Sequence, residues 1–206
     1  MAVFVLSLNR SDQIREVEFA RRLADELERL GIRVKFVNCS GAQLLCGKLI
    51  DNSYDVIVVV SHGGSEPPAT PLGGRGRATI QTHLADGCTP EHIAAQLDSP
   101  DVLMQLLEGN PTPYVLVYCV CEADSIDTHA ATFSDPQCLG VVASECKVWT
   151  SQLPAVVDLV SEAHAAVASG HTDVNELYDT VAKVVKRHGG KPPFRYKPAI
   201  RIEEGG

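Results

Sequence analysis

The sequence predicts an α/β fold, specifically a three-layer α/β/α sandwich with a mostly parallel central sheet. Short apolar runs rich in valine and isoleucine alternate with longer segments in which apolar residues recur every three or four positions. Their order is that of parallel strands joined by helices, which cover both faces of such a sheet. The 206 residues suffice for one sizeable domain and are too few for two, so we expect residues 1–206 to form a single domain.

The first half of the chain alternates between strand and helix patterns. Strands are expected at 2–8, 32–39 and 54–61, and helices at 11–31 and 40–52. The third strand contains a continuous β-branched run, which is typical of a strand covered on both faces. The residues that follow are rich in glycine and proline without periodicity, so we predict a mobile loop at 64–77. Residues 78–87 are expected to form a strand or hairpin arm.

The second half repeats the alternation and then ends in helices. Helices are expected at 89–97 and 102–110, strands at 114–120 and 138–144, and long amphipathic helices at 153–170 and 174–190. Thr89 followed by Pro90 is a favoured helix start, and each of the two long helices ends in glycine. The tail at 191–206 is rich in proline and glycine, and we expect at most an edge strand from it.

Composition narrows the class of protein. A hydrophobic fraction of 45% with 21% charged residues is ordinary for a globular protein. The net charge of −8 argues against nucleic acid or anionic lipid as the main partner. The apolar segment at residues 1–10 has no positive charge before it and no small-residue cleavage site after it, so it is expected to be the first strand and not a signal peptide. Seven cysteines without a staple pattern, together with the missing signal, suggest reduced thiols in a cytoplasm. No apolar stretch approaches the roughly 18 to 20 residues that span a bilayer, so we expect no membrane partner.

Two predicted strands end on residues that carry chemistry. His62, Gly63 and Gly64 follow the strand at 54–61, and Cys121 follows the strand at 114–120. In open parallel sheets, ligands bind beyond the carboxyl ends of the strands, where this histidine and this cysteine could converge. A deprotonated thiol is an effective nucleophile, and a neighbouring imidazole can accept its proton. A bare glycine N–H suits a developing oxyanion, which completes a minimal set of groups for acyl transfer from a peptide bond.

Each of these residues also has an ordinary structural role. A histidine at a strand end is more often a surface residue, and cysteines in β-branched strands are usually small core residues. A zinc site is weakly indicated, because C-x-C spacing without a second knuckle is not a usual zinc motif. Such a site would combine Cys119 and Cys121 with His62, His129 or Cys138. No glycine-rich phosphate motif follows the first strand, so we predict neither a metal nor a cofactor.

Four segments resemble the caspase-like cysteine peptidases, most closely the CHAT branch, which is widespread in bacteria and is related to caspases and separase. These segments are "VIVVVSHGG", "HLADGCTPEHIAAQL", "YVLVYCVCEAD", and "CLGVVASECKVWTSQLPAVVDLV" with the helix pair after it. The resemblance covers nearly the whole chain, and it rests on the order and spacing of the segments. A caspase nucleophile follows its histidine by about 50 residues, and the interval in this chain is slightly longer.

The resemblance implies a caspase-type fold and a catalytic dyad of His62 and Cys121. The backbone N–H groups of Gly63 and Cys121 would form the oxyanion hole. Cys119 occupies the position that lines the first specificity pocket in relatives, and strand alternation puts it on the same face as Cys121. We favour Cys121 as the nucleophile because the chain leaves the apolar strand there and a nucleophile needs exposure.

Three further residues are candidates for substrate binding. Asp124 stands where relatives often carry a small residue, and it would either select a basic P1 side chain or be a solvated loop charge. The resemblance to caspase-like peptidases implies that the edge of the strand that ends at Ser144 can pair with an extended substrate backbone. Trp149, just beyond that strand, would line a subsite or pack in the core.

We therefore expect a cysteine endopeptidase that cleaves a protein substrate through an acyl-enzyme. Activation is expected from a separate activator or sensor protein or from processing. Arg75 and Arg77 make the loop at 64–77 a candidate gate or self-cleavage segment. The alternative is a catalytically silent caspase-like α/β module that binds a partner protein.

Overall fold

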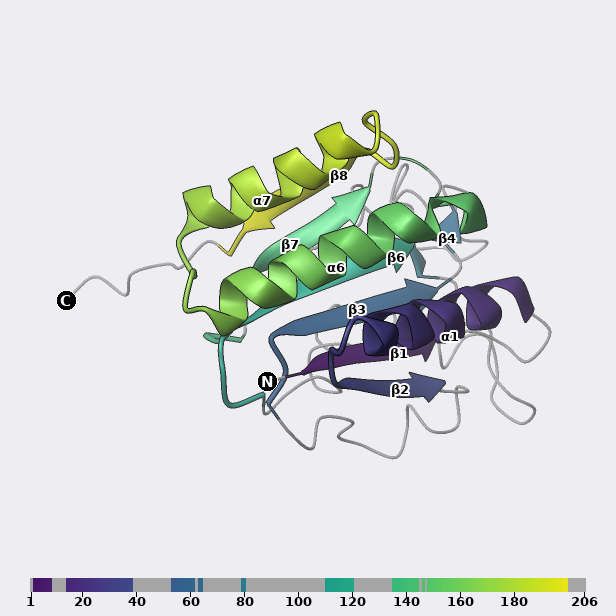
Figure 1. The fold of residues 1–206 in the computed structure, drawn as a ribbon, viewed down its shortest axis with the longest axis horizontal. Coiled ribbons are helices and arrows are strands. Elements are labelled where there is room, and N and C mark those ends of the chain that lie inside the picture. The colour runs from purple at the N-terminus through teal and green to yellow at the C-terminus, as the bar shows by residue number, and fades with distance from the viewer. Residues whose placement is uncertain are drawn as a thin grey trace, which may run out of the picture.

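The computed structural model describes residues 2–8, 14–38, 53–61, 63–64, 79–80, 110–120, 135–144, 146 and 148–199. A six-stranded sheet in the order β2-β1-β3-β6-β7-β8 forms their centre (Figure 1). Its strands are β1 (Val3–Leu8), β2 (Val34–Asn38), β3 (Val56–Ser61), β6 (Tyr114–Val120), β7 (Cys138–Ser144) and β8 (Phe194–Pro198). The first five are parallel and β8 runs antiparallel to β7, so the predicted α/β class with a mostly parallel sheet is confirmed.

Three long helices cover one face of this sheet. They are α1 (Ile14–Arg29), α6 (Leu153–Ala168) and α7 (Val174–Arg187), and a short 3-10 helix, η2 (Thr150–Gln152), leads into α6. Figure 1 shows α1 across β1 and β3, α6 across β3 and β6, and α7 beside β8. All three helices lie where periodicity predicts them. Gly31, with φ of +81°, lets the chain turn away after α1.

Both faces of the sheet are buried, as the β-branched runs predict. Alternate residues of the strands, such as Val58 and Val117, pack against the helices. The intervening residues, such as Ile57 and Leu116, form a second apolar cluster on the opposite face and are fully buried there as well. Burial on both faces is consistent with the three-layer sandwich. The helices predicted at 40–52 and 89–97, and most of that at 102–110, lie outside the described residues.

The chain closes the sheet with β8, which lies at one edge as expected from the sequence. Tyr196 of β8 packs directly over Gly140 of β7, and its hydroxyl donates a hydrogen bond of 2.9 Å to the carbonyl of Leu139. A Cβ atom at residue 140 would lie only 2.5 Å from the carbonyl oxygen of Lys197 and 2.7 Å from the Tyr196 ring. Only glycine therefore lets these two strands approach as closely as they do.

A separate two-stranded ladder stands beside the end of β3. It consists of β4 (Gly63–Gly64) and β5 (Thr79–Ile80), which are antiparallel, with Gly63 opposite Ile80 and Gly64 opposite Thr79. The start of the predicted 78–87 strand therefore forms a hairpin arm. Gly64, taken from the sequence as the first residue of a mobile loop, belongs to a strand, and the rest of that range lies outside the described residues.

Candidate active site

The candidate site lies at the carboxyl edge of the parallel strands. Neighbouring strands end level with one another there, because Leu8 of β1 pairs with Ser61 of β3 and Ser61 pairs with Val120 of β6. The next residues in the chain are the predicted dyad, His62 after Ser61 and Cys121 after Val120. Both dyad residues lie outside the described residues, so the dyad stays a prediction.

The backbone around the predicted histidine is partly described. Gly63 lies in β4, opposite Ile80 of β5, so a strand ladder begins one residue after position 62. The predicted oxyanion role of the Gly63 N–H rests on the resemblance alone. Asp124, the predicted determinant of P1 preference, lies outside the described residues.

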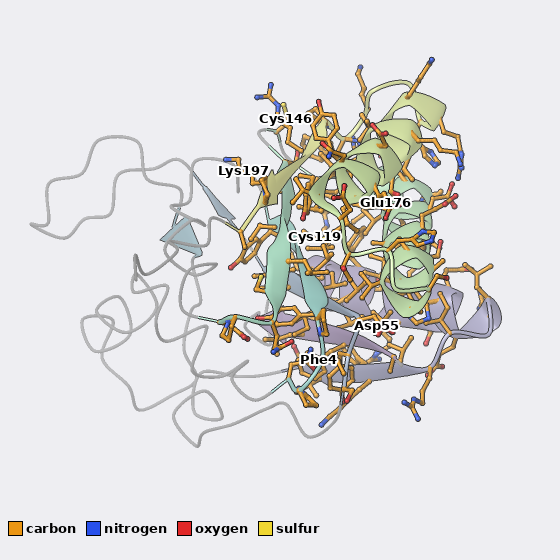
Figure 2. The ribbon with its side chains drawn as sticks, turned by 90° about the vertical axis from the view of Figure 1, so that its left-hand side faces the viewer. Phe4, Asp55, Cys119, Cys146, Glu176 and Lys197 are labelled. Atoms are coloured by element: carbon orange, nitrogen blue, oxygen red, sulfur yellow. The ribbon has the colours of Figure 1, made fainter. Side chains whose placement is uncertain are left out.

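Cys119 is a core residue. Its side chain is 5% exposed and belongs to the apolar cluster between the sheet and the helices. Burial raises the pKa of the Cys119 thiol to about 12, so it stays protonated near neutral pH. Figure 2 labels it among the side chains packed beside the helices. A protonated, enclosed thiol is a poor nucleophile, which agrees with the preference for Cys121. It also favours the packing role of Cys119 over one at a pocket border.

Ser144 uses its hydroxyl to end β7. The side chain is fully buried, and its oxygen donates to the Cys146 carbonyl at 3.1 Å and accepts from the Cys146 N–H at 3.2 Å. These two bonds turn the chain sharply at the carboxyl edge. The predicted contact of Ser144 with substrate would have to come from its backbone, since the hydroxyl is already engaged.

Cys146 also lies at this edge, and sequence reasoning gave it no role in the site. It is exposed and free, and it lies at the periphery in Figure 2, whereas Cys119 and Cys138 are buried. Ser144, two residues earlier, could have indicated the turn that exposes Cys146, because serine hydroxyls commonly bond to the backbone two residues on and form turns. An exposed thiol beside the predicted site is a competitor that any labelling experiment must account for.

Trp149 is an exposed residue, so its predicted alternative as a core tryptophan is wrong. Its side chain is 60% exposed, and its backbone N–H donates to Gln152 Oε1 at 2.8 Å. This bond fixes the turn that leads into η2 and α6. A large apolar side chain held outward on an ordered turn is suited to contact another molecule.

The outer edge of β7 is occupied by β8, so an extended peptide cannot pair along the whole strand as the sequence led us to expect. β8 pairs with β7 from Gly140 to Ser144, and β6 pairs with its other side from Cys138 to Val142. From Gly140 to Val142 the backbone groups on both sides of β7 therefore pair within the sheet. A substrate strand could add only at Ala143 and Ser144, on the side of β6, or beyond them.

Two other features bear on possible ligands. Within the described ranges, no group of three or more histidine, cysteine, aspartate or glutamate side chains is placed to hold a metal ion. A hollow of about 630 Å³ lies between α1 and the start of α6, with Leu153 and Val157 among its apolar lining. Arg22, Glu26 and Asp158 also line it, and this mixture of charges favours no single class of ligand.

A scan against protein-family models found no match to this chain, and a search of curated proteins found no significant match. Of the helices in the described part of the chain, none is long and apolar enough to cross a bilayer.

Proposed function

We propose that the protein is a caspase-like cysteine endopeptidase of the CHAT branch, with His62 and Cys121 as its catalytic dyad. The observation that carries the proposal is the register of β3 and β6, in which Ser61 and Val120 are partners at the carboxyl edge. The two residues named from the sequence are the ones that directly follow this pair.

Chain geometry supports the meeting of the two side chains. Adjacent strands lie about 4.8 Å apart, and consecutive Cα atoms are about 3.8 Å apart. Two residues that directly follow a pair of strand partners can therefore have their Cα atoms at most about 12 Å apart, whatever direction each takes. Side chains of this size can span most of that distance and reach hydrogen-bond contact. Strands that ended at opposite edges would have ruled out the dyad.

The proposed chemistry needs only these groups and water. His62 accepts the thiol proton of Cys121, and the thiolate attacks the carbonyl carbon of the peptide bond. Negative charge that develops on the carbonyl oxygen is stabilised by the N–H groups of Gly63 and Cys121. The C–N bond then breaks, His62 gives its proton to the leaving amine, and a thioester remains on Cys121. Water attacks the thioester, releases the new carboxylate and restores the thiol.

The remaining parts of the proposal concern the substrate, the activation of the peptidase and its cellular setting. The substrate is a protein, and a separate activator or sensor protein, or processing of the chain, switches the peptidase on. The seven cysteines without a staple pattern support a reducing, cytoplasmic setting. Asp124 is proposed to favour a basic P1 side chain, because a carboxylate near that pocket attracts lysine or arginine.

The test compares Cys121→Ala with a matched control, Cys146→Ala. A peptide library identifies a cleaved substrate for the purified wild-type protein, and all variants are assayed on it. We expect Cys121→Ala to reduce kcat/KM by about a thousandfold or more, because the nucleophile is lost. Cys146→Ala, which removes the exposed cysteine nearby, should retain activity within about twofold. Thermal unfolding of each variant checks that the fold is intact.

Labelling by iodoacetamide at mildly acidic pH provides a second readout. A thiolate activated by His62 reacts under these conditions, whereas an ordinary thiol is mostly protonated and reacts slowly. Mass spectrometry should therefore find label on Cys121 in the wild type and much less of it in His62→Ala. If Cys121→Ala leaves both proteolysis and labelling unchanged, the assignment is wrong. If labelling shows no activated thiol and no peptide is cleaved, the catalytically silent binding module is the better description.

A further inference from the structure

A buried ionisable pair lies at the opposite edge of the sheet from the proposed site. Asp55 immediately precedes β3 and is 2% exposed, and Figure 2 labels it at the sheet. His164 of α6 faces it with a side chain 17% exposed, and its Nδ1 atom lies 2.9 Å from Asp55 Oδ2. The pair joins the strand that leads toward position 62 to the helix that follows η2.

The contact is close but poorly directed for a hydrogen bond. Neither Asp55 Oδ2 nor His164 Nδ1 has a hydrogen-bond partner of good geometry among the described residues. The backbone of Asp55 is held in the sheet, since its N–H donates to the Ala2 carbonyl at 2.9 Å and its carbonyl accepts from the Val115 N–H at 3.0 Å. The carboxylate of Asp55 is itself buried, and its interaction with the imidazole is chiefly electrostatic.

Few charges act on Asp55. Burial raises the pKa of its carboxyl above the ordinary value, and the positive charges of His164 and of the amino group at the start of the chain oppose that rise. The neighbouring strands β1 and β6 contribute backbone groups through Ala2 and Val115. Among the described residues, His164 forms no other ion pair. The state of the pair therefore depends mainly on the proton that its two members can share.

We propose that Asp55 and His164 form a proton-dependent clasp that fastens the C-terminal half of α6 to the start of β3. The clasp holds while the pair keeps its proton, and it weakens as the pH rises and the proton leaves. The inference is independent of the proposed peptidase activity, because it concerns a different edge of the sheet and different residues.

The sign of the effect follows from the charges. Loss of the proton that the pair shares leaves a buried carboxylate beside a neutral imidazole, and a buried charge without a counter-charge is costly. A carboxyl whose pKa is raised in the folded state favours folding most at low pH, and this contribution is lost as the pH rises through its folded pKa. Both effects lower the stability of the wild type as the pH rises.

The experiment measures the thermal midpoint of unfolding between pH 5.5 and pH 8.5 for the wild type and three variants. Asp55→Asn removes the buried charge and keeps the shape, so its profile should be flatter. Relative to this variant, the wild-type Tm should fall by about 3 °C or more across the range. The control, His171→Gln, changes an exposed histidine of the α6–α7 connection and should follow the wild type.

The third variant, His164→Gln, leaves Asp55 without a positive partner at every pH. Its Tm should lie well below that of the wild type at pH 6, and adding Asp55→Asn to it should recover much of the loss. Hydrogen exchange at pH 8 tests the location: amides in the C-terminal half of α6 should exchange faster in the wild type than in Asp55→Asn. Parallel pH profiles of the wild type and Asp55→Asn would overturn the clasp. A double-mutant cycle without coupling would do the same, and if His164→Gln fails to fold, the comparison of the wild type with Asp55→Asn still decides.

Discussion

The two edges of the sheet differ in which side chains they expose. At the amino edge, Asn110 is buried, and its side chain binds the backbone of Tyr54, at 2.8 Å to the N–H and 2.9 Å to the carbonyl. Asp55, the residue after Tyr54, is buried as well. At the carboxyl edge the Ser144 hydroxyl is buried too, but the turn after β7 carries the exposed side chains of Cys146 and Trp149.

The difference separates stability from function. The Asn110 side chain and the Tyr54 backbone satisfy one another and fix the amino edge in place, so removing this side chain is costly. Exposed side chains on an ordered turn contribute little to folding but are available to other molecules. Substitutions at the amino edge should therefore alter unfolding, whereas substitutions at the carboxyl edge should alter activity.

The largest effect on stability is expected from Asn110→Ala. The change leaves the Tyr54 N–H and carbonyl without their buried partners and also removes the bond of 2.8 Å to the Thr112 carbonyl. We expect the free energy of unfolding to fall by about 3 kcal/mol, measured by urea denaturation. Asn175→Ala, at an exposed position of α7, is the control and should change it by less than about 0.5 kcal/mol. A loss below about 1 kcal/mol for Asn110→Ala would contradict the conclusion that its side-chain hydrogen bonds fix the amino edge in place.

Trp149→Ala tests the opposite edge, and it depends on the proposed function. Because the side chain is 60% exposed, its removal should leave Tm nearly unchanged. If the tryptophan contacts substrate, KM should rise by about five- to tenfold, which corresponds to about 1 kcal/mol of binding, with little change in kcat. The control is Tyr178→Ala, which removes an aromatic side chain of similar exposure, 58%, from α7. An unchanged KM together with a large fall in Tm would assign Trp149 to stability instead.

The smallest effect is expected from Asp158 of α6, whose pH dependence should oppose that of Asp55. Its Oδ2 lies 2.8 Å from His188 Nε2 and accepts from Arg187 Nη1 at 3.2 Å. The hydrogen bond with His188 is the main cause that lowers the pKa of Asp158 below its ordinary value of 3.8. Its stabilising contribution is therefore present above that value and is lost as the pH falls through the folded pKa.

Asp158→Asn should lower Tm at pH 6 by no more than about 3 °C, because solvent screens this exposed network. The wild type and Asp158→Asn should converge once the pH falls below the lowered folded pKa of Asp158, since the carboxyl is then protonated in the wild type. A difference that widens toward low pH would contradict the assigned sign.

Local patterns in the sequence were enough to predict the central fold. The β-branched run of β3 and the three-to-four periodicity of α1 each depend on the side chains of one segment, and both elements are where the sequence predicts them. The bonds of Asn110 to Tyr54 could not be predicted in this way, because they join segments 56 residues apart. Of the short β4–β5 ladder the sequence predicts only the β5 side, as a strand or hairpin arm, and it assigns Gly64 of β4 to a mobile loop, because two glycines carry no apolar pattern.

The candidate site was predictable only in part. Two buried strands in a parallel sheet are expected to end at the same edge, and β3 and β6 do so. That they are direct neighbours could not be predicted, because the apolar pattern of a strand does not say which strand it pairs with. Burial of Cys119 agrees with its place in an apolar strand. The exposure of Trp149 could not be decided, because a single aromatic in a segment without periodicity has no face to which it can be assigned. His164 and Asp55 were missed for a related reason: their pairing is a tertiary contact between a helix and a distant strand.

The close fit of Tyr196 over Gly140 also has a consequence during synthesis. β8 is the last strand described, so a growing chain on the ribosome presents β7 with an unoccupied side until residues 194–198 emerge. Until then the outer side of β7 is an unpaired strand edge, to which another extended segment, including one from a sister chain, can bind. Completion of the sheet therefore depends on β8, a short strand that is synthesised late and must place the ring of Tyr196 over Gly140.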